Sequence, residues 1–361
     1  MTNMEASCHI SYQTLTFDDF VSRYQEQLPT VKLFELTLPW LMATRDFMMA
    51  TNDKLVVHCL YSNDETAPQL LIAWPLIHRG KHNKLQLHSL SSFYSAMAEP
   101  YYTSDDGKAH LPSLLKYIDK NTTWHSMNLG GFAENANVPC ALTKYFKACK
   151  LFNETANFYQ DNLVDFNSYY QQLPSQLRNT VKRRSKKLAA AHPYNIRIIN
   201  TLDDFITAFE GYKSIYQQSW KGEEFSFAFI EQVCRAAIAE NKLRFGMLYV
   251  DNKPAAAQLW FLQSGTASIF KLAYDQQYKN FSVGSILSMA LSEHVLEYDK
   301  VTCIEFGMGS EPYKKDWLAK QRQRVSYQIF NQQRFLGKIA SFRYITLPYY
   351  KNLWFSKNNE Q

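Results

Sequence analysis

The spacing of hydrophobic residues changes several times along the chain, and this is typical of a mixed α/β protein. Apolar residues that recur every three to four positions predict helices, and short apolar runs between them predict strands. In the first half, the predicted helices are Phe17–Gln27, Phe34–Met49, His110–Lys120 and Val138–Cys149. The predicted strands there are Leu55–Tyr61, Gln69–Ile77, Leu85–Ser89 and Thr123–Leu129, with Asn157–Asn162 extended.

The second half repeats this alternation with clearer boundaries. Three predicted strands are joined by the short turns Asp251–Lys253 and Ser264-Gly265, which indicates an antiparallel meander. The predicted helices are Phe166–Leu173, Ser175–Ala191, Asp203–Gln218, Phe227–Glu240 and Ser282–Leu296. The predicted strands are Asn195–Ile199, Arg244–Val250, Pro254–Gln263, Thr266–Tyr274, Thr302–Phe306 and Gln323–Phe330.

The two halves share an order of elements, although few residues are identical. Each runs through helices, a hairpin of long strands, a helix and a strand that ends at glycine, as in WHSMNLGGF and CIEFGMGSE. A chain of 361 residues also exceeds the size at which one core usually stops growing. We therefore expect two related domains, residues 1–164 and residues 165–361.

Composition excludes several classes of protein. With 46% hydrophobic and 20% charged residues, the chain is neither disordered nor collagen-like. A net charge of +6 is too small to imply nucleic-acid binding by itself, and no DNA partner is expected. Six scattered cysteines without a CxxC pair, no apparent signal peptide and no apolar run of about 20 residues favour a cytoplasmic protein. No metal-ligand pattern is present, so no metal is expected. No G-x-S-x-G motif is present either, so a Ser-His-Asp triad is not indicated.

The segment Ser282-Val283-Gly284-Ser285 opens a predicted helix directly after a loop. The first N–H groups of a helix are unpaired and carry partial positive charge, so they can bind phosphate oxygens. Gly284 would let a ligand approach the backbone, and Lys279 would add a cation. The alternative is an ordinary helix start with a glycine that serves packing.

Four segments of the second half, in this order and spacing, resemble the GNAT acyltransferase superfamily in its FemAB/CelD-like branch. They are LRNTVKRRSKKL, FGMLYVDNKPAAAQLWF, IFKLAYDQQYKNFSVGSIL and IEFGMGSEPYKKDWL. The first half resembles the branch more faintly, through LPWL, LIAWPLI and FYSAMAEPYY. The resemblance implies two GNAT-like domains in tandem, each a mostly antiparallel sheet flanked by helices. It places the acyl-CoA site in the second domain.

The resemblance also suggests roles for individual residues. The GNAT signature Q/R-x-x-G-x-G/A holds the CoA pyrophosphate, and Lys279–Ser285 occupies its place with only Gly284 and Ser285 in common. The donor is therefore acyl-CoA, such as acetyl-CoA, or another activated acyl group. FemAB-type enzymes carry a lysine in a pattern like F-K-x-x-F, which the segment Tyr313–Trp317 matches with Lys314. By this resemblance Lys314, next to Tyr313, stabilises the oxyanion or contacts the acceptor.

An amine that attacks a thioester must lose a proton while the carbonyl oxygen gains negative charge. Glu305, near the end of a predicted buried strand, is a candidate proton acceptor. Lysine or backbone N–H groups would stabilise the oxygen. The alternative for Glu305 is a structural salt bridge to Lys271 or Lys314.

Further polar and aromatic residues are candidates for substrate contacts. Gln258 shares a strand face with large apolar residues, which favours a cleft over open water, and Lys271 and Tyr274 on the next strand are similar. Trp220 is either a wall for the acceptor or a buried packing residue.

A basic run of residues 178–187 falls on one predicted helix and contains no acidic residue. Arg184 lies on its apolar stripe, so we expect it to pair with a carboxylate or a ligand phosphate. The run could contact tRNA, a nucleotide sugar or an anionic membrane, or it could be a solvated face. The basic and aromatic C-terminal segment is expected to form a docked helix, with contact to a membrane surface as the alternative.

The leading hypothesis is an acyl-CoA-dependent N-acyltransferase whose acceptor is an amine of a cell-envelope or exopolysaccharide precursor, such as an amino sugar. One alternative is a FemAB-like transferase that uses aminoacyl-tRNA. The other is a degenerate GNAT fold that binds a partner without catalysis.

Overall fold

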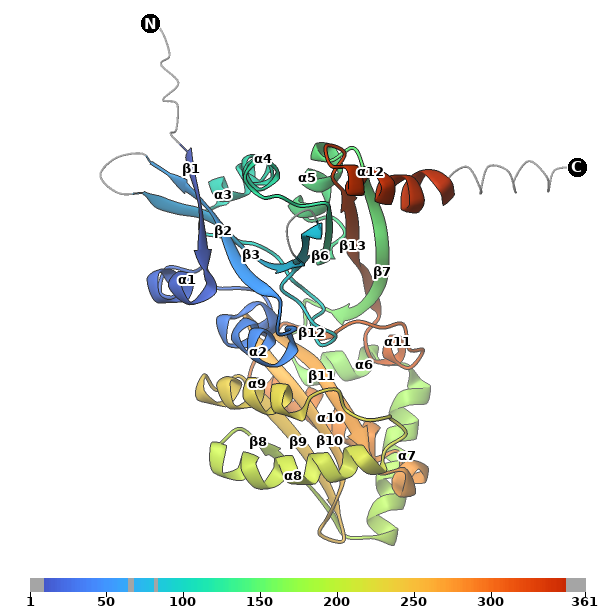
Figure 1. Cartoon of the computed structure of the whole chain (residues 1–361). Coiled ribbons are helices and arrows are strands. Elements are labelled where there is room, and N and C mark those ends of the chain that lie inside the picture. Colours follow the sequence, from blue (N-terminus) through green and yellow to red (C-terminus); the bar gives the residue numbers. More distant parts are fainter. Residues whose placement is uncertain (1–9, 64–67, 81–83, 349–361) are drawn as a thin grey trace, which may run out of the picture. The chain divides into compact units, whose positions relative to one another are not determined.

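The computed structural model describes residues 10–63, 68–80 and 84–348, and these divide into two compact units (Figure 1). The first unit draws on residues 1–30, 49–155 and 323–361, and the second on residues 31–48 and 156–322. Both units therefore contain segments from distant parts of the sequence. The roles expected for residues 1–164 and 165–361 stay predictions.

The first unit is built on a mixed sheet. Its strand order is β1 (Ile10–Thr16), β2 (Lys54–Ser62), β3 (Gln69–Arg79), β4 (Gln86–Ser89), β6 (Ser126–Ala133), β13 (Lys320–Phe330) and β7 (Cys149–Gln160). The pairs from β1 to β4 are antiparallel, β4 and β6 are parallel, and β6 and β13 are antiparallel. The short β5 (Tyr101–Tyr102) pairs with β3.

Several helices flank the sheet of the first unit, and the longer ones bury apolar side chains in its core. They are α1 (Phe17–Tyr24), α3 (Asp105–Ala109), α4 (Leu111–Asn121), α5 (Asn137–Tyr145) and α12 (Phe335–Ser341), which continues into the π-helix η4 (Phe342–Thr346). Leu114 of α4 and Trp124 are buried in one cluster with Trp74 and Phe132 of the sheet. This cluster is the core of the first unit.

The second unit also contains a series of parallel and antiparallel strands. The strand order is β7, β12 (Cys303–Phe306), β11 (Thr266–Tyr274), β10 (Lys253–Gln263), β9 (Leu243–Val250) and β8 (Tyr194–Ile199). Strands β8 to β11 are antiparallel, β11 and β12 are parallel, and β12 and β7 are antiparallel. Its helices are η1 (Phe34–Leu36), α2 (Leu38–Met48), α6 (Phe166–Gln172), α7 (Ser175–Ala191), α8 (Leu202–Gln218), α9 (Phe227–Ala239), η3 (Gln276–Phe281), α10 (Val283–Glu297) and α11 (Lys314–Trp317).

The two units follow one plan of strand pairing. Four antiparallel strands are followed by a parallel fifth and an antiparallel sixth, in the orders β1-β2-β3-β4-β6-β13 and β8-β9-β10-β11-β12-β7. The sixth strand in each case comes from another part of the chain: β13 follows the second series, and β7 follows the first. The predicted α/β class with mixed sheets flanked by helices is confirmed.

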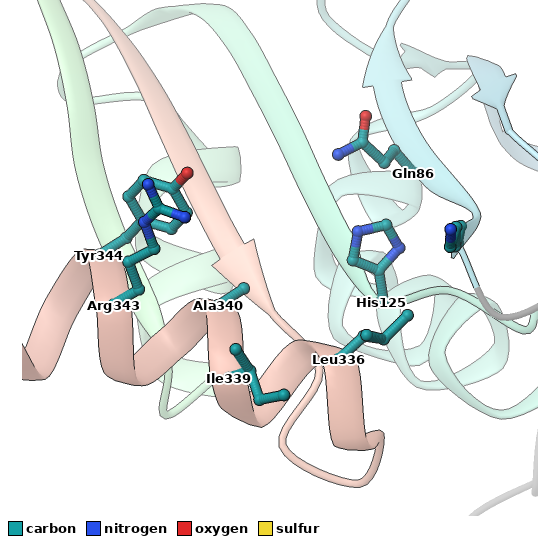
Figure 2. Close-up of a pocket in the computed structure, with 8 residues that line it drawn as sticks. Gln86, His125, Leu336, Ile339, Ala340, Arg343 and Tyr344 are labelled. Carbon is teal, nitrogen blue, oxygen red and sulfur yellow. The ribbon is translucent and has the colours of Figure 1, made fainter.

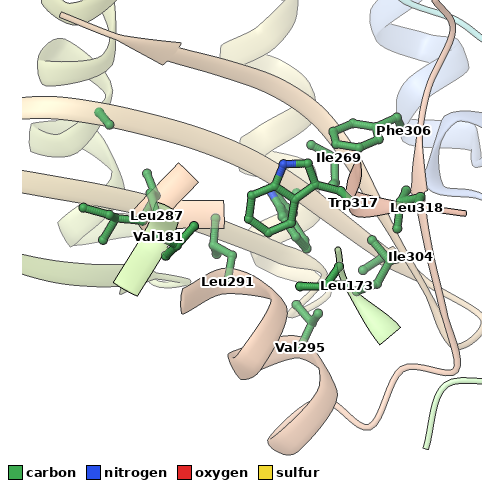
Figure 3. Packing of buried hydrophobic residues seen from close by; sticks show 14 of the residues in the cluster. Leu173, Val181, Ile269, Leu287, Leu291, Val295, Ile304, Phe306, Trp317 and Leu318 are labelled. Atoms are coloured by element: carbon green, nitrogen blue, oxygen red, sulfur yellow. The ribbon is translucent and has the colours of Figure 1, made fainter. Parts of the chain in front are cut away.

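The core of the second unit fixes the position of α10. Leu287, Leu291 and Val295 of this helix are buried in a cluster with Ile304 of β12 and Trp317 of α11 (Figure 3). Gly246 on β9 lets the helix approach, because a Cβ there would stand 2.7 Å from a methyl carbon of Leu291. The helix start is thereby held rigidly near the ends of β10 and β11.

Candidate functional site

The start of α10 has the backbone geometry of an anion site. Ser282 adopts a left-handed conformation with φ of 56°, and its hydroxyl makes no capping hydrogen bond. The amide of Ile286 bonds to the carbonyl of Ser282, which begins the helical pattern. The first-turn N–H groups, on Val283, Gly284 and Ser285, are therefore left to other partners. Residues that cap a helix with their side chain normally have an extended backbone, whereas Ser282 is left-handed, and its side chain does not cap α10.

Gly284 has a packing role, which is the alternative that the sequence analysis gave for this residue. A Cβ on this residue would stand 3.2 Å from Cδ1 of Tyr274, closer than an ordinary carbon contact. The ring of Tyr274 on β11 thus occupies the side of the helix that we expected to be open to a ligand. The small residue brings β11 and the helix start together.

Gln258 joins β10 to the same helix. Its amide Nε2 donates to the carbonyl of Gly284 at 2.9 Å and to Oγ of Ser288 at 2.7 Å. Its Oε1 accepts from the indole of Trp260 at 2.9 Å. The side chain shares its face with large apolar groups, as the alternation indicates, but it is buried and bonded to protein. The structure thus gives Gln258 a part in positioning α10, and its contact with substrate stays a prediction.

The basic helix α7 lies beside the segment that precedes α10. Arg184 Nη1 donates to the carbonyl of Asn280 at 2.5 Å, and Lys187 Nζ lies 5.3 Å from the ring centre of Phe281. The expected partner of Arg184 was a carboxylate or a phosphate, whereas the bond formed is to a backbone carbonyl of η3. Lys279 is exposed on η3. Three cations therefore lie on or beside the segment that leads into α10.

A second group of charged residues contains Lys271 and Lys314. Lys271 forms an ion pair of 2.9 Å with the buried carboxylate of Glu224, which is also 3.5 Å from the hydroxyl of Tyr212. Burial lowers the pKa of Lys271, and Glu224 opposes that shift. Lys314 is 5% exposed and donates to the carbonyl of Met308 at 2.7 Å and to Glu311 at 2.8 Å. Both lysines are thus held by neighbouring acceptors.

Lys221 is a functional candidate that the sequence analysis missed. Burial and the charge of Lys271 lower its pKa to about 8, while Glu224 and Glu311 oppose the shift and Lys314 adds to it. Its Nζ lies 5.6 Å from the ring centre of Tyr216 and 5.7 Å from that of Trp220. Within the described residues this ammonium has no hydrogen-bond or ion-pair partner. The three lysines Lys221, Lys271 and Lys314 thus face only two carboxylates, Glu224 and Glu311, which leaves one positive charge unbalanced. The sequence feature that could have indicated Lys221 is the charged stretch WKGEE between two predicted helices.

Trp220 connects the lysines to the start of α10. Its ring centre lies 4.6 Å from that of Tyr274, which packs on Gly284. It is 48% exposed, so it is not the buried packing residue given as one alternative. Trp220 follows the end of α8 and lies outside the core, so about half of its indole is exposed, as expected for a residue that lines an acceptor site. Tyr274 and Trp220 form a continuous aromatic path between the two groups.

Glu305 belongs to a separate set of contacts. It is 1% exposed, and its carboxylate pairs with Arg322 at 2.5 Å and lies 3.4 Å from Oγ of Ser268. Arg322 also donates to Oδ1 of Asn157 at 2.6 Å and lies over the ring of Tyr159. The salt bridge considered for Glu305 therefore has a different partner, because Lys271 and Lys314 are bound to Glu224 and Glu311.

Tyr313 is partly exposed beside Lys314. Its ring meets Phe306 edge-on, with ring centres 5.7 Å apart. Burial, followed by the charge of Glu311, raises the pKa of Tyr313 to about 12. The hydroxyl is therefore protonated at neutral pH and can act as a hydrogen-bond donor.

The described part of the chain offers neither a metal site nor a membrane-spanning helix. Among residues 10–63, 68–80 and 84–348, no group of three or more His, Cys, Asp or Glu side chains is arranged to hold a metal ion. No helix within the same ranges combines the length and apolar character needed to cross a membrane.

Comparisons with known proteins bear on this unit. Residues 175–315 match the family model described as acetyltransferase (GNAT) domain. FemX is similar in structure, with a TM-score of 0.59 at 10% identity over 90% of this chain and 98% of that chain. A conserved protein of unknown function from Bacteroides thetaiotaomicron VPI-5482 gives 0.55 at 12% identity over 89% and 100%. L-PGS from Bacillus licheniformis gives 0.51 at 11% identity over 90% and 94%. A comparison with curated proteins finds no match.

The matched domain contains both groups of candidate residues, from Arg184 on α7 to Lys314 on α11. Similarity to FemX and L-PGS at such low identity is a likeness of fold. Residues 175–315 are a GNAT acetyltransferase domain, which makes the protein an acyltransferase, and the fold of the chain is similar to that of FemX. The resemblance seen in the sequence is thereby confirmed.

Proposed function

We propose that the protein is an acyl-CoA-dependent N-acyltransferase that acts on an amine of a cell-envelope or exopolysaccharide precursor, such as an amino sugar. The observation that carries this proposal is the aromatic path from Gly284 through Tyr274 and Trp220 to Lys221. It joins a helix start suited to phosphate with a cationic group suited to a reacting carbonyl, inside the matched GNAT domain.

The donor would bind with its pyrophosphate at the start of α10. The first-turn amides of Val283, Gly284 and Ser285 supply N–H donors and the positive end of the helix dipole. Arg184 and Lys187 of α7 lie beside this point, and Lys279 precedes it. Phosphate charges would thus meet both backbone and side-chain cations.

The transfer would be direct. The acceptor nitrogen attacks the thioester carbonyl, the C–S bond breaks, and CoA leaves as the thiol after taking up a proton. The ammonium of Lys221 has no hydrogen-bond or ion-pair partner in the part of the chain that the structure describes, and it can donate to the carbonyl oxygen as its negative charge grows. Lys314 holds the loop at Met308–Glu311 and adds positive charge nearby, and Tyr313 can donate a hydrogen bond.

Glu305 is our candidate for the base that takes the proton from the attacking nitrogen, and this proton is then passed on to the sulfur of the leaving CoA. Arg322 fixes its carboxylate, and the hydroxyl of Ser268 lies next to it. Because the carboxylate is buried, a proton would reach it through a hydroxyl or a water molecule.

Thermal unfolding with acetyl-CoA tests the donor. A ligand that binds only the native state at 100 times its Kd stabilises that state by about 2.7 kcal/mol, so the melting temperature should rise. Desulfo-CoA should give a similar rise, because it keeps the pyrophosphate, whereas acetyl-pantetheine should not. No rise with millimolar acetyl-CoA would contradict the proposal.

The basic face of α7 favours one second candidate, a transferase that uses aminoacyl-tRNA. Lys182, Arg183 and Lys186 are on this helix with no acidic residue among them, and the fold is similar to that of FemX. Phosphate contacts of a tRNA would make binding fall steeply with salt. Filter binding at 50 and 200 mM salt separates the two cases, since the CoA enzyme should not retain tRNA. A protein that binds neither donor would be the degenerate GNAT fold.

A further inference from the structure

The C-terminal helical segment turns apolar side chains outward. Phe335 is 77% exposed and Phe342 is 56% exposed, while Ile339 and Leu347 are about half exposed. A helix that packs on a protein normally presents polar residues to solvent. Here the inward positions hold small residues such as Gly337 and Ser341, and the outward ones hold large apolar residues.

Close packing fixes this orientation. A Cβ on Gly337 would stand 2.1 Å from the carbonyl oxygen of Asn331, so the helix backbone lies directly on the preceding turn. Tyr344 stacks on Phe330 of β13 with ring centres 5.9 Å apart, and Lys150 Nζ donates to the carbonyl of Tyr344 at 3.1 Å. The helix is therefore docked, as expected for this segment, and its outward apolar face results from that docking.

The same face is cationic. Arg334, Lys338 and Arg343 are exposed among the apolar residues, and residues 331–348 contain no acidic residue. Apolar side chains mixed with lysine and arginine are the pattern of helices that lie in the plane of a membrane interface. Anionic lipids attract such cations, at about 1 kcal/mol for each. Charge thus favours an anionic lipid surface as the occupant of this face.

A hollow beside the helix supplies a place for a lipid headgroup (Figure 2). It measures about 430 Å³ and lies between α12–η4 and residues of β4 and the α4–β6 connection. Lys84 and Arg343 line it together with His125, whose buried Nδ1 has no hydrogen-bond partner among the residues that the structure describes. Leu336 and Ile339 line its apolar side. Cations and an unused histidine nitrogen beside apolar groups suit a phosphate attached to an acyl glycerol.

We propose that residues 335–347 dock the protein on an anionic phospholipid bilayer, with a headgroup phosphate in the hollow lined by Lys84, His125 and Arg343. This proposal is independent of the acyltransferase reaction. The bound segment lies in the interface and does not cross the bilayer.

Vesicle flotation with the full-length protein tests the proposal. Vesicles of phosphatidylglycerol and phosphatidylcholine in a 1:2 ratio should carry the protein to the top of the gradient, and phosphatidylcholine vesicles should not. Raising the salt to 0.5 M should release most of it, because screening weakens the charge attraction.

Two double variants separate the apolar and the cationic contributions. Lys338→Gln with Arg343→Gln should lower the binding constant by about 25-fold, at about fivefold for each charge. Phe335→Ser with Phe342→Ser should abolish flotation. The matched control is Lys253→Gln with Tyr298→Ser, which changes one exposed cation and one exposed aromatic of the second unit. It should bind as the wild type does, and circular dichroism should show all variants folded.

Three results would overturn the proposal: no flotation of the wild type with anionic vesicles, equal flotation of the charge variant and the wild type, or equal loss in the control. A wild-type dimer in analytical ultracentrifugation that the Phe335→Ser, Phe342→Ser variant converts to monomer would also overturn it. That result would assign the face to a second copy of the chain.

Discussion

At the scale of single residues, the second unit holds several lysines with little exposure whose charges are balanced to different degrees. Lys271 and Lys314 have carboxylate partners, whereas Lys221 is placed among them without one. A partly buried cation without a partner is unfavourable unless a ligand compensates it, and this is reflected in its lowered pKa. The unbalanced charge of Lys221 therefore favours the binding of a negatively charged ligand group at this place.

Replacing Lys221 by Met should reduce turnover by about 10- to 100-fold and leave the Kd of acetyl-CoA within about twofold, because the charge acts on the reacting carbonyl. Since Lys221 is cationic below its pKa of about 8, its contribution should be present below that pH and be lost above it. The alkaline limb of the rate profile near pH 8 should disappear in the variant. Release of free CoA with a panel of amino sugars measures both effects. Lys315→Met, an exposed neighbour of Lys314, is the matched control.

Lys314→Ala should reduce turnover more strongly, by roughly a hundredfold, and it should also loosen the loop that Lys314 bonds to at Met308 and Glu311. Protection of these amides against hydrogen exchange should fall in this variant and not in Lys315→Ala. Unchanged kinetics would remove the proposed role of Lys314.

A buried histidine pair in the first unit should make its stability depend on pH. His58 Nε2 lies 3.0 Å from His78 Nε2, and burial lowers their pKa values to about 3 and about 4. The unfolded chain takes up protons near pH 6.5, while the folded pair does not. Stability is therefore full above pH 6.5 and falls as pH decreases toward 4, at up to about 1.4 kcal/mol per pH unit for each histidine.

Urea unfolding of the first unit at pH 7, 6 and 5 measures this slope. In His58→Gln the slope should be about two thirds of that of the wild type, because His78 and His88, whose pKa values burial lowers to about 4, still lose protons on folding. Equal slopes in the two proteins would contradict the assignment.

At the scale of elements, local patterns predicted most helices and strands. The helix Ser175–Ala191 and the strand Thr266–Tyr274 were predicted with the bounds that the structure has, because their apolar periods are regular. Strand β7 was predicted only as the extended piece Asn157–Asn162, whereas it begins at Cys149. Its first residues are largely exposed and polar, so they give no alternating signal.

Gly337→Ala tests how strongly α12 is docked. The new methyl group would stand 2.1 Å from a backbone oxygen, so the helix must move, at an expected cost of about 1–3 kcal/mol. Calorimetry should show a lower melting temperature for the first unit. Gly222→Ala is the control, since nothing lies within 4 Å of its added Cβ, and it should melt as the wild type does.

At the scale of the whole molecule, each unit is completed by a strand from the other half of the sequence. Residues 1–164 alone lack β13, the neighbour of β6. Residues 165–361 alone lack β7, the neighbour of β12, and lack α2, whose Trp40 packs on Phe229 and Phe261. A missing strand leaves an unpaired sheet edge, and a missing helix leaves apolar surface exposed.

Neither fragment should therefore unfold cooperatively when expressed alone, and mixing the two should restore the transitions of the intact chain. Urea unfolding followed by circular dichroism measures this. A cooperative transition in an isolated fragment would show that the exchanged strand is dispensable.

The sequence by itself determined the periods of the helices and strands, the α/β class and the GNAT resemblance of the second half, since these depend on neighbours in the chain. It also indicated Gly284, Tyr274, Trp220 and Lys314. The tertiary structure decided which charges meet: Glu305 with Arg322, Lys271 with Glu224, and Lys221 with none. It also decided that β7 pairs with β12 and that β13 pairs with β6. Ion pairs and strand pairing join residues far apart in the chain, and no local pattern encodes such distances.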